Sequence, residues 1–101
     1  MIIREWRGRA RRSQADAYPR HFRERVISEL RQVPGFMGAQ LSRRDVDGGV
    51  EFLVLTQWQS MDAIRGFAGT EVDKAVVEPV AAATLVEFDE RVRHYEVVET
   101  A

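Results

Sequence analysis

Cysteine is absent from this sequence of 101 residues, and histidine occurs only as His21 and His94. Without cysteine the chain has no disulfide framework, no thiol catalysis and no cysteine-ligated zinc or iron–sulfur site. Two scattered histidines, with no carboxylates at metal-ligand spacing, do not predict a metal site. The sequence also lacks a glycine-rich phosphate loop and the nucleophile elbow of serine hydrolases.

Long apolar runs are missing as well. None approaches the ~20 residues that a membrane-spanning helix needs, and residues 1–6 lack the apolar core of a signal peptide. We therefore expect a cytoplasmic protein that does not enter a membrane. The length predicts a single domain over residues 1–101.

Neither sign of charge is in excess. The 15 basic and 16 acidic residues give a net charge of −1, whereas nucleic-acid-binding proteins usually carry a clear basic excess. We therefore expect no nucleic acid as a partner. All basic residues except Lys74 are arginine, a bias typical of a GC-rich, bacterial genome.

The first third of the chain has the pattern of a strand followed by a helix. Residues 2–12 alternate as in a strand, and the face expected to look toward the core consists of Ile2, Arg4, Trp6, Gly8 and Ala10. Ser13, with Asp16 three residues on, predicts the start of a helix that ends at Pro34-Gly35. Pro19 indicates that this helix is distorted near residue 15 or is regular only from Pro19 onward. The expected buried stripe is Tyr18, Phe22, Val26, Leu30 and Val33.

The rest of the chain predicts a hairpin, short helices and a last strand. The turn at residues 47–49 joins strands at 36–46 and 50–58, and Ser60 caps a helix that Gly69 ends. Thr70 with Asp73 predicts a further helical turn, Pro79 begins another that runs to residue 83, and residues 91–98 form the last strand. The order is βαββαβ, which predicts an α+β, ferredoxin-like fold with a four-stranded antiparallel sheet and helices on one face.

The strand at residues 50–58 is apolar on both faces at its centre. Phe52 and Val54 lie on one face, and Leu53 and Leu55 lie on the other. Helices cover only one face, and each large apolar side chain left bare would forgo about 2 kcal/mol of burial. The open face of the sheet therefore predicts a partner, most simply a second copy of the chain in a homodimer.

Three passages resemble the antibiotic biosynthesis monooxygenase superfamily, and the resemblance covers nearly the full length. They are ELRQVPGF (29–36), FLVLTQWQSMDAIRGFAG (52–69) and FDERVRHYEV (88–97). The resemblance implies a homodimer whose two sheets form an α/β barrel, with a pocket between the sheet and the helices of each subunit. Oxygenases of this superfamily oxidise phenolic, quinone-type or polyketide-like aromatics with molecular oxygen, without flavin or metal. No cofactor is therefore expected.

That chemistry needs a base, a donor or cation that holds the substrate anion, and a dry apolar wall. His94 is the candidate base and Arg4 the candidate anion holder. Each has a structural alternative: a packed core or interface histidine for His94, and a salt bridge to Glu87 or Glu96 for Arg4. The predicted wall around a small hydrophobic ligand consists of Trp6, Phe22, Trp58, Met61 and Phe67, which are otherwise ordinary core residues. Residues 66–79 are the expected flexible mouth.

The superfamily also contains haem-degrading enzymes, which carry an asparagine on the first strand, a tryptophan on the second helix and a histidine soon after it. These positions fall on Trp6, Phe67 and Val77 here, so haem degradation by that mechanism is not expected. Two alternatives to a cofactor-independent monooxygenase stay open. One is a non-oxidative isomerase, dehydratase or cyclase, and the other is a ligand-binding or structural dimer without chemistry.

Overall fold

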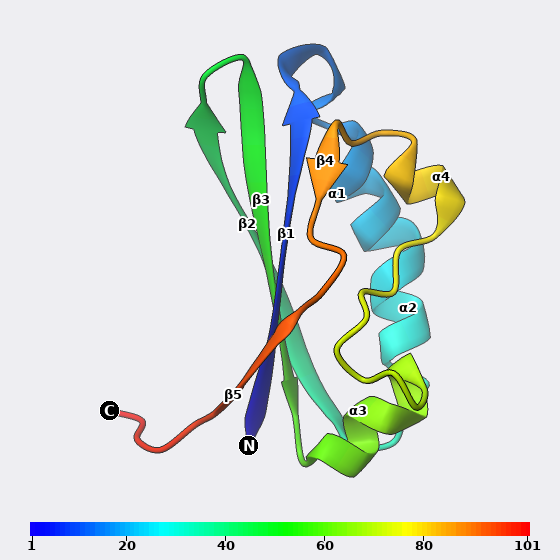
Figure 1. The fold of residues 1–101 in the computed structure, drawn as a ribbon, viewed down its shortest axis with the longest axis vertical. Helices are drawn as coiled ribbons and strands as arrows, with labels where there is room; N and C mark the ends of the chain where they lie inside the picture. Colours follow the sequence, from blue (N-terminus) through cyan, green and yellow to red (C-terminus); the bar gives the residue numbers. More distant parts are fainter.

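A computed structural model describes residues 1–101 and consists of an antiparallel sheet with all helices on one side (Figure 1). The strands lie in the order β2-β3-β1-β4, and β5 also pairs with β1. Because β3 occupies one edge of β1, β4 and β5 share the other edge. The predicted α+β, ferredoxin-like fold is confirmed. The strands are β1 (Ile2–Arg11), β2 (Phe36–Val46), β3 (Gly49–Trp58), β4 (Glu87–Phe88) and β5 (Arg93–Glu96).

The two central strands place the core. β1 and β3 pair without a break from Ile2 opposite Trp58 to Arg11 opposite Gly49. Alternate residues of each strand are buried against the helices, because successive side chains of a strand point to opposite faces. The inner face that the sequence predicts for residues 2–12 is confirmed, and on β3 both Phe52 and Trp58 are fully buried.

The predicted hairpin between β2 and β3 is also confirmed. Asp47 and Gly48 form its turn, and Gly48 has a φ of 78°, a left-handed conformation that favours glycine.

The first helical region is more irregular than its sequence pattern predicts. It consists of η1 (Arg12–Gln14), α1 (Ala17–His21), the π-helical η2 (Phe22–Val26) and α2 (Ile27–Leu30). The predicted start at Ser13 is wrong, because Ser13 lies in the short 3₁₀ turn. Of the two alternatives for Pro19, the distortion near residue 15 is confirmed, because residues 15–16 form a turn between η1 and α1. Pro19 is the third residue of α1 and not its first, and it lies within the first turn, where backbone N–H groups have no helical acceptor. Across these segments Tyr18, Phe22 and Leu30 of the predicted stripe are buried.

The second helical region begins as predicted and then departs from prediction. In α3 (Met61–Ala68) the Ser60 hydroxyl accepts a hydrogen bond from the Ala63 N–H at 3.2 Å, and Gly69 ends the helix with a φ of 83°. The helical turn predicted over Val72 and Val76 is present only in part: the Lys74 N–H donates to the Glu71 carbonyl at 3.0 Å, but residues 75–78 have no regular structure before α4 (Pro79–Ala82). The backbone of this connection bonds elsewhere in the chain: the Ala75 N–H donates to the Glu90 carbonyl at 2.9 Å.

The last strand is shorter than the predicted 91–98 and is split in two. Between β4 and β5 the chain leaves β1 and bonds to the 73–75 segment, where the Val92 N–H donates to the Asp73 carbonyl at 2.8 Å. Beyond β5, Val98 is 88% exposed. The fourth strand of the sheet is therefore interrupted between β4 and β5, where the backbone of residues 90 and 92 bonds to the connection after α3 instead of to β1.

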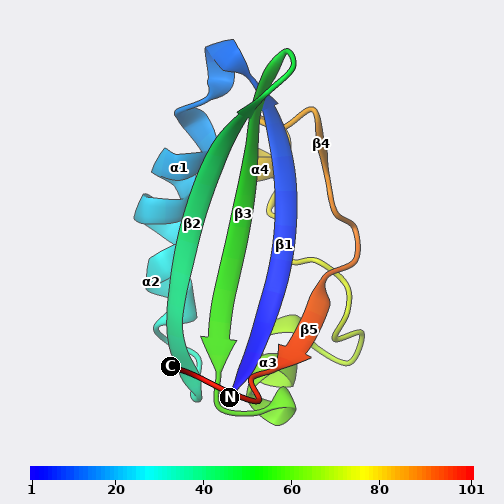
Figure 2. The same cartoon turned by 90° about the vertical axis from the view of Figure 1, so that its left-hand side faces the viewer.

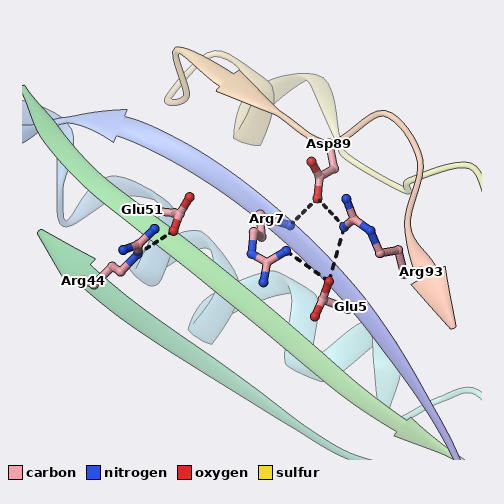
Figure 3. Close-up of polar contacts among 6 residues, drawn as sticks. All are labelled: Glu5, Arg7, Arg44, Glu51, Asp89 and Arg93. Atoms are coloured by element: carbon pink, nitrogen blue, oxygen red, sulfur yellow. Dashed lines mark hydrogen bonds and ion pairs between the residues drawn. The ribbon is translucent and has the colours of Figure 1, made fainter. Parts of the chain in front are cut away.

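No helix covers the face of the sheet opposite the helices, and only the C-terminal segment passes in front of it, at its lower end (Figure 2). On this face Ile3, Leu53 and Leu55 are half-buried. Around them lie arginines paired with carboxylates; Glu5, for example, accepts hydrogen bonds from Arg7 at 3.1 Å and Arg93 at 3.2 Å (Figure 3). We call this surface the open face. None of the helices on the other side combines the length and apolar character that a bilayer crossing requires.

Candidate functional site

A pocket lies between the inner face of the sheet and the helices, with an empty volume of about 710 Å³ including its open mouth. Ten of its 15 lining residues are hydrophobic, so a bound molecule would meet mainly apolar surface. β1 and β3 contribute Arg4, Trp6, Val54 and Thr56. The first helical region contributes Tyr18, His21, Val26, Glu29 and Leu30, and the remaining wall is Phe67, Val76, Val77, Glu78, Ala81 and Val92.

Strand register brings the two predicted catalytic residues together. Arg4 on β1 stands opposite Thr56 of β3 on one side and opposite His94 of β5 on the other. Thr56 and Arg4 line the pocket, whereas His94 does not. The three side chains therefore form a row across neighbouring strands, and only the two nearer the sheet centre meet the pocket.

Arg4 is 5% exposed, and its guanidinium bonds mostly to backbone. Nη1 donates to the Val72 carbonyl at 2.7 Å and to His94 Nε2 at 2.9 Å, and Nη2 donates to the Lys74 carbonyl at 2.9 Å. The ring of Phe67 lies 5.7 Å from Cζ. Arg4 thus fastens the connection after α3 to the sheet.

No carboxylate bonds to Arg4. The alternative of a salt bridge to Glu87 or Glu96 is wrong, since Glu87 pairs instead with Arg9 at 2.9 Å. Burial lowers the pKa of Arg4 to about 10, and attraction from the nearby Asp73 offsets part of that shift. Arg4 is still charged at neutral pH, so the pocket contains a buried cation without a contacting anion.

His94 acts as a bridge between Arg4 and Asp73. Arg4 is a donor only, so His94 Nε2 must accept, and His94 Nδ1–H then faces Asp73 Oδ1 at 3.2 Å. Desolvation and the charge of Arg4 lower the pKa of His94, while Asp73 acts in the opposite direction. The Nε2 lone pair is therefore occupied by Arg4. The role of His94 as a base stays a prediction, and this arrangement suits a positioning residue better.

Tyr18 is a pocket residue that the sequence pattern assigned only to the buried stripe. It is 6% exposed, lines the pocket, and its hydroxyl makes no hydrogen bond within the chain. Its ring packs 5.3 Å from that of Trp6 and 5.5 Å from that of Phe52. Burial raises the pKa of the phenol, so Tyr18 is neutral and offers a donor. The one signal in the sequence was a hydroxyl-bearing aromatic in an otherwise apolar stripe.

Of the five predicted wall residues, Trp6 and Phe67 line the pocket. The indole N–H of Trp6 donates to the Asp89 carbonyl at 3.1 Å, so that polar group is already satisfied. Trp58 lies behind the wall instead: its ring stacks 5.6 Å from Phe67, and its Nε1 donates to Thr56 Oγ1 at 2.8 Å.

Phe22 and Met61 are not pocket-lining residues either. Phe22 is buried in the main core cluster, and Met61 packs against the cluster around Trp58. Their direct contact with a ligand has no support in this geometry, because the helical periodicity that predicted an inward side chain did not distinguish core from cavity.

Residues of the predicted mouth do border the pocket. Val76, Val77 and Glu78 from the connection after α3 line it, and Glu78 forms an ion pair with Arg25 at 3.7 Å. This connection is held by Arg4, so the pocket wall and the buried cation are mechanically linked.

Residues 1–79 match the family model described as antibiotic biosynthesis monooxygenase, and the chain therefore belongs to this family. No curated protein matches the chain by sequence. Its fold is similar to that of a Caulobacter crescentus CB15 protein assigned to the antibiotic biosynthesis monooxygenases, at 20% identity and a TM-score of 0.71. That match covers 97% of this chain and 90% of the other.

Two further solved structures have names that state an activity. One is SnoaB, a cofactor-independent oxygenase from Streptomyces nogalater, with 20% identity, a TM-score of 0.67 and coverage of 98% of this chain and 94% of SnoaB. The other is the haem degrader MhuD from Mycobacterium tuberculosis with two haems bound, with 21% identity, a TM-score of 0.63 and 98% coverage of both chains. At this identity the likeness concerns the fold alone.

The residues do not fit haem held in the way that the superfamily's haem degraders imply. The three positions identified above, Trp6, Phe67 and Val77, all line the one pocket. The position of the expected histidine is Val77, whose side chain has no atom that could coordinate iron.

Proposed function

We propose that the protein is a cofactor-independent oxygenase of the antibiotic biosynthesis monooxygenase type, which acts on a small aromatic or quinone-like molecule with an ionisable hydroxyl. The observation that carries this proposal is the buried guanidinium of Arg4, which no carboxylate contacts, on the wall of an apolar pocket. A buried charge is costly unless it is paired. An anionic ligand would supply the missing partner.

Each lining group has a role in this mechanism. Arg4 stabilises the ligand in its ionised form, because a nearby cation lowers the pKa of a phenol. Glu78 and His21 both line the pocket and can accept the released proton. Tyr18 donates a hydrogen bond to the ligand, and the rings of Trp6 and Phe67 exclude water. The bound anion passes one electron to molecular oxygen, and the two resulting radicals combine to form a peroxide. The O–O bond of that peroxide then breaks with loss of water to leave a quinone, so substrate and oxygen supply all the electrons and no flavin or metal is needed.

His94 and Asp73 hold the guanidinium in place. With Nε2 fixed as an acceptor, His94 keeps one Arg4 donor turned away from the ligand. In this proposal His94 is a positioning residue in the neutral state.

Oxygen consumption tests the proposal. With a panel of naphthols and hydroxyquinones, we expect enzyme-dependent oxygen uptake that Arg4→Met lowers at least ~10-fold, since hydrogen bonds to charged groups contribute about 1.5–3 kcal/mol. Tyr18→Phe should lower it less, because the lost donor is neutral. Turnover of the same compounds without oxygen would favour the isomerase, dehydratase or cyclase alternative. Binding without any turnover would favour the ligand-binding dimer.

The same proposal includes a homodimer formed through the open face. Its support is the half-buried Ile3, Leu53 and Leu55 on a sheet surface that no helix covers (Figure 2). Pairing two such faces would bury these side chains and produce the α/β barrel that the family resemblance implies.

A further inference from the structure

We infer that Thr56 is a further substrate-binding residue of this pocket. Its hydroxyl donates a hydrogen bond to the ligand oxygen that Arg4 stabilises, and Trp58 fixes the direction of that hydroxyl from behind the pocket wall. The inference rests on the proposed function, because the oxygen that both groups bind is the ionised hydroxyl of the proposed substrate.

Arg4 and Thr56 differ from the rest of the buried chain in polarity. Apart from aromatic residues, they have the only buried side chains with a polar or charged group, at 5% and 6% exposed. They stand directly opposite each other on β1 and β3, and both line the pocket. Opposite residues of an antiparallel pair have Cβ atoms about 5 Å apart. Every other inward residue of β3 is aliphatic or aromatic, so these two neighbours form the polar part of the sheet wall.

The bond from Trp58 decides how the Thr56 hydroxyl is used. Nε1 of Trp58 donates to Thr56 Oγ1 at 2.8 Å, and an indole nitrogen is a donor only. Thr56 therefore accepts in this bond, and its own proton is left for another acceptor. The bond from Trp58 is the only side-chain hydrogen bond that Thr56 makes, so the chain supplies no such acceptor. Because a buried donor without an acceptor is costly, an oxygen in the adjoining pocket is the partner that we assign to it.

The aromatic ring of Phe67 joins Trp58 to Arg4. It stacks 5.6 Å from Trp58 and lies 5.7 Å from Cζ of Arg4, and Phe67 itself lines the pocket. The cation and the indole that orients the hydroxyl thus pack against one ring. Two fixed donors on one oxygen stabilise its negative charge more than one donor does. Trp58 does not line the pocket, so it acts through Thr56 and is a positioning residue.

Thr56→Val tests the hydroxyl, because valine has nearly the same shape and no donor. Thr56→Ser is the matched control that keeps the hydroxyl. The fluorescence of the naphthalene ring reports binding of naphthol and of naphthalene to each variant. The preference for naphthol over naphthalene measures recognition of the oxygen, since a packing defect lowers both affinities. We expect Thr56→Val to lower this preference at least ~10-fold and Thr56→Ser to keep it within about 3-fold. An unchanged preference in Thr56→Val would overturn the inference.

Trp58→Phe tests the positioning role, because it keeps an aromatic ring beside Phe67 and removes the N–H. The Thr56 hydroxyl can then occupy three staggered orientations, so the preference for naphthol should fall about 3-fold. Combined with Thr56→Val, the same change should have no further effect on the preference, since no hydroxyl is left to orient. A preference in the double variant well below that of Thr56→Val would refute the positioning role of Trp58.

The double variant also serves if Thr56→Val, which leaves the Trp58 N–H without an acceptor, does not fold by circular dichroism. It removes both partners of the bond, and its preference for naphthol should lie below that of Trp58→Phe. Equal preferences in these two variants would show that the Thr56 hydroxyl binds no ligand oxygen.

Oxygen uptake separates this inference from the proposed function. Uptake that depends on Arg4, with an unchanged naphthol preference in Thr56→Val, would refute the role of Thr56 and leave the oxygenase. A lost preference in Thr56→Val, with no oxygen uptake by any compound in the panel, would support the role of Thr56 and refute the oxygenase.

Discussion

Arginines on the two faces of β1 have opposite surroundings. On the open face, Arg7 meets the carboxylate of Glu5 at 3.1 Å and Arg9 meets that of Glu87 at 2.9 Å. On the inner face, Arg4 meets two carbonyls and a neutral histidine. Arg7 and Arg9 are thus paired with carboxylates on the open face, whereas Arg4 on the inner face contacts no anion. This difference within one strand is what the proposed anionic ligand of the pocket requires.

The open face pairs its charges in a particular way. In two of its pairs the carboxylate side chain is less exposed than the arginine: Glu51 is 19% exposed against 72% for Arg44, and Glu5 is 15% exposed against 43% for Arg7 (Figure 3). The pair of Arg9 with Glu87 is the exception, since the Glu87 side chain is 62% exposed. The hydrogen bond from Arg44 lowers the pKa of Glu51. Where two copies meet over the Glu5 and Glu51 pairs, these charges would already have partners within each chain.

The largest expected effect concerns the apolar centre of the open face. Leu55→Arg should convert a dimer into a monomer, because it removes about 2 kcal/mol of burial from each subunit and adds a charge to the interface. Two such losses weaken association roughly 1,000-fold. Sedimentation velocity at micromolar concentration measures the change.

The control for that variant is Val80→Arg, the same kind of change at an exposed residue of α4 on the helical side. It should leave the dimer intact. An unmodified chain that sediments as a folded monomer would contradict the proposed pairing of open faces.

A smaller effect is expected from the charge pairs of the open face. Glu5→Gln removes the negative charge that two arginines share, and the Glu5 side chain is only 15% exposed. We expect the free energy of unfolding to fall by about 1 kcal/mol, since the arginines themselves are about half exposed and solvent weakens the pairs.

The matched control is Asp62→Asn, which breaks the Arg65–Asp62 pair on the surface of α3. This pair is short, at 2.6 Å, but the Asp62 side chain is 91% exposed, so its loss should change stability by less than about 0.5 kcal/mol. Urea denaturation compares the two variants. Equal losses in the free energy of unfolding would show that the partial burial of the Glu5 carboxylate does not strengthen its ion pairs.

The smallest expected effect is a pH dependence on the pocket side. The pKa of His94 is lower in the folded chain than its ordinary value of 6.5, so the unfolded chain takes up a proton first as the pH falls. Stability should therefore decrease as the pH drops below about 6.5, until the folded form is protonated as well. Urea denaturation across this range measures it.

His94→Gln should remove that part of the pH dependence, since glutamine can accept from Arg4 and donate to Asp73 without titrating. His21→Gln is the control, because His21 makes no hydrogen bond or ion pair in the structure, and it should keep the dependence. If both glutamine variants retain the same profile, the link from Asp73 through His94 to Arg4 does not govern it.

Local signals in the sequence determined most of the scaffold. Alternation in residues 2–12 and 50–58 specified which side chains of β1 and β3 are buried, Asp47-Gly48 specified the hairpin, and Ser60 and Gly69 bounded α3. Each of these features depends on residues a few positions apart, whose conformational preferences act within a single turn or strand.

Only the tertiary structure decided the site. Arg4 and His94 are 90 positions apart, and it is the register of β5 on β1 that puts Nη1 beside Nε2. The same register, together with the carbonyls of residues 72 and 74, uses three of the five N–H donors of Arg4 and gives it no carboxylate partner. The sequence alone predicted a cation, Arg4, on the inward face of β1. Which groups bond to that cation depends on pairing between segments far apart in the chain, and no local sequence pattern specifies that pairing.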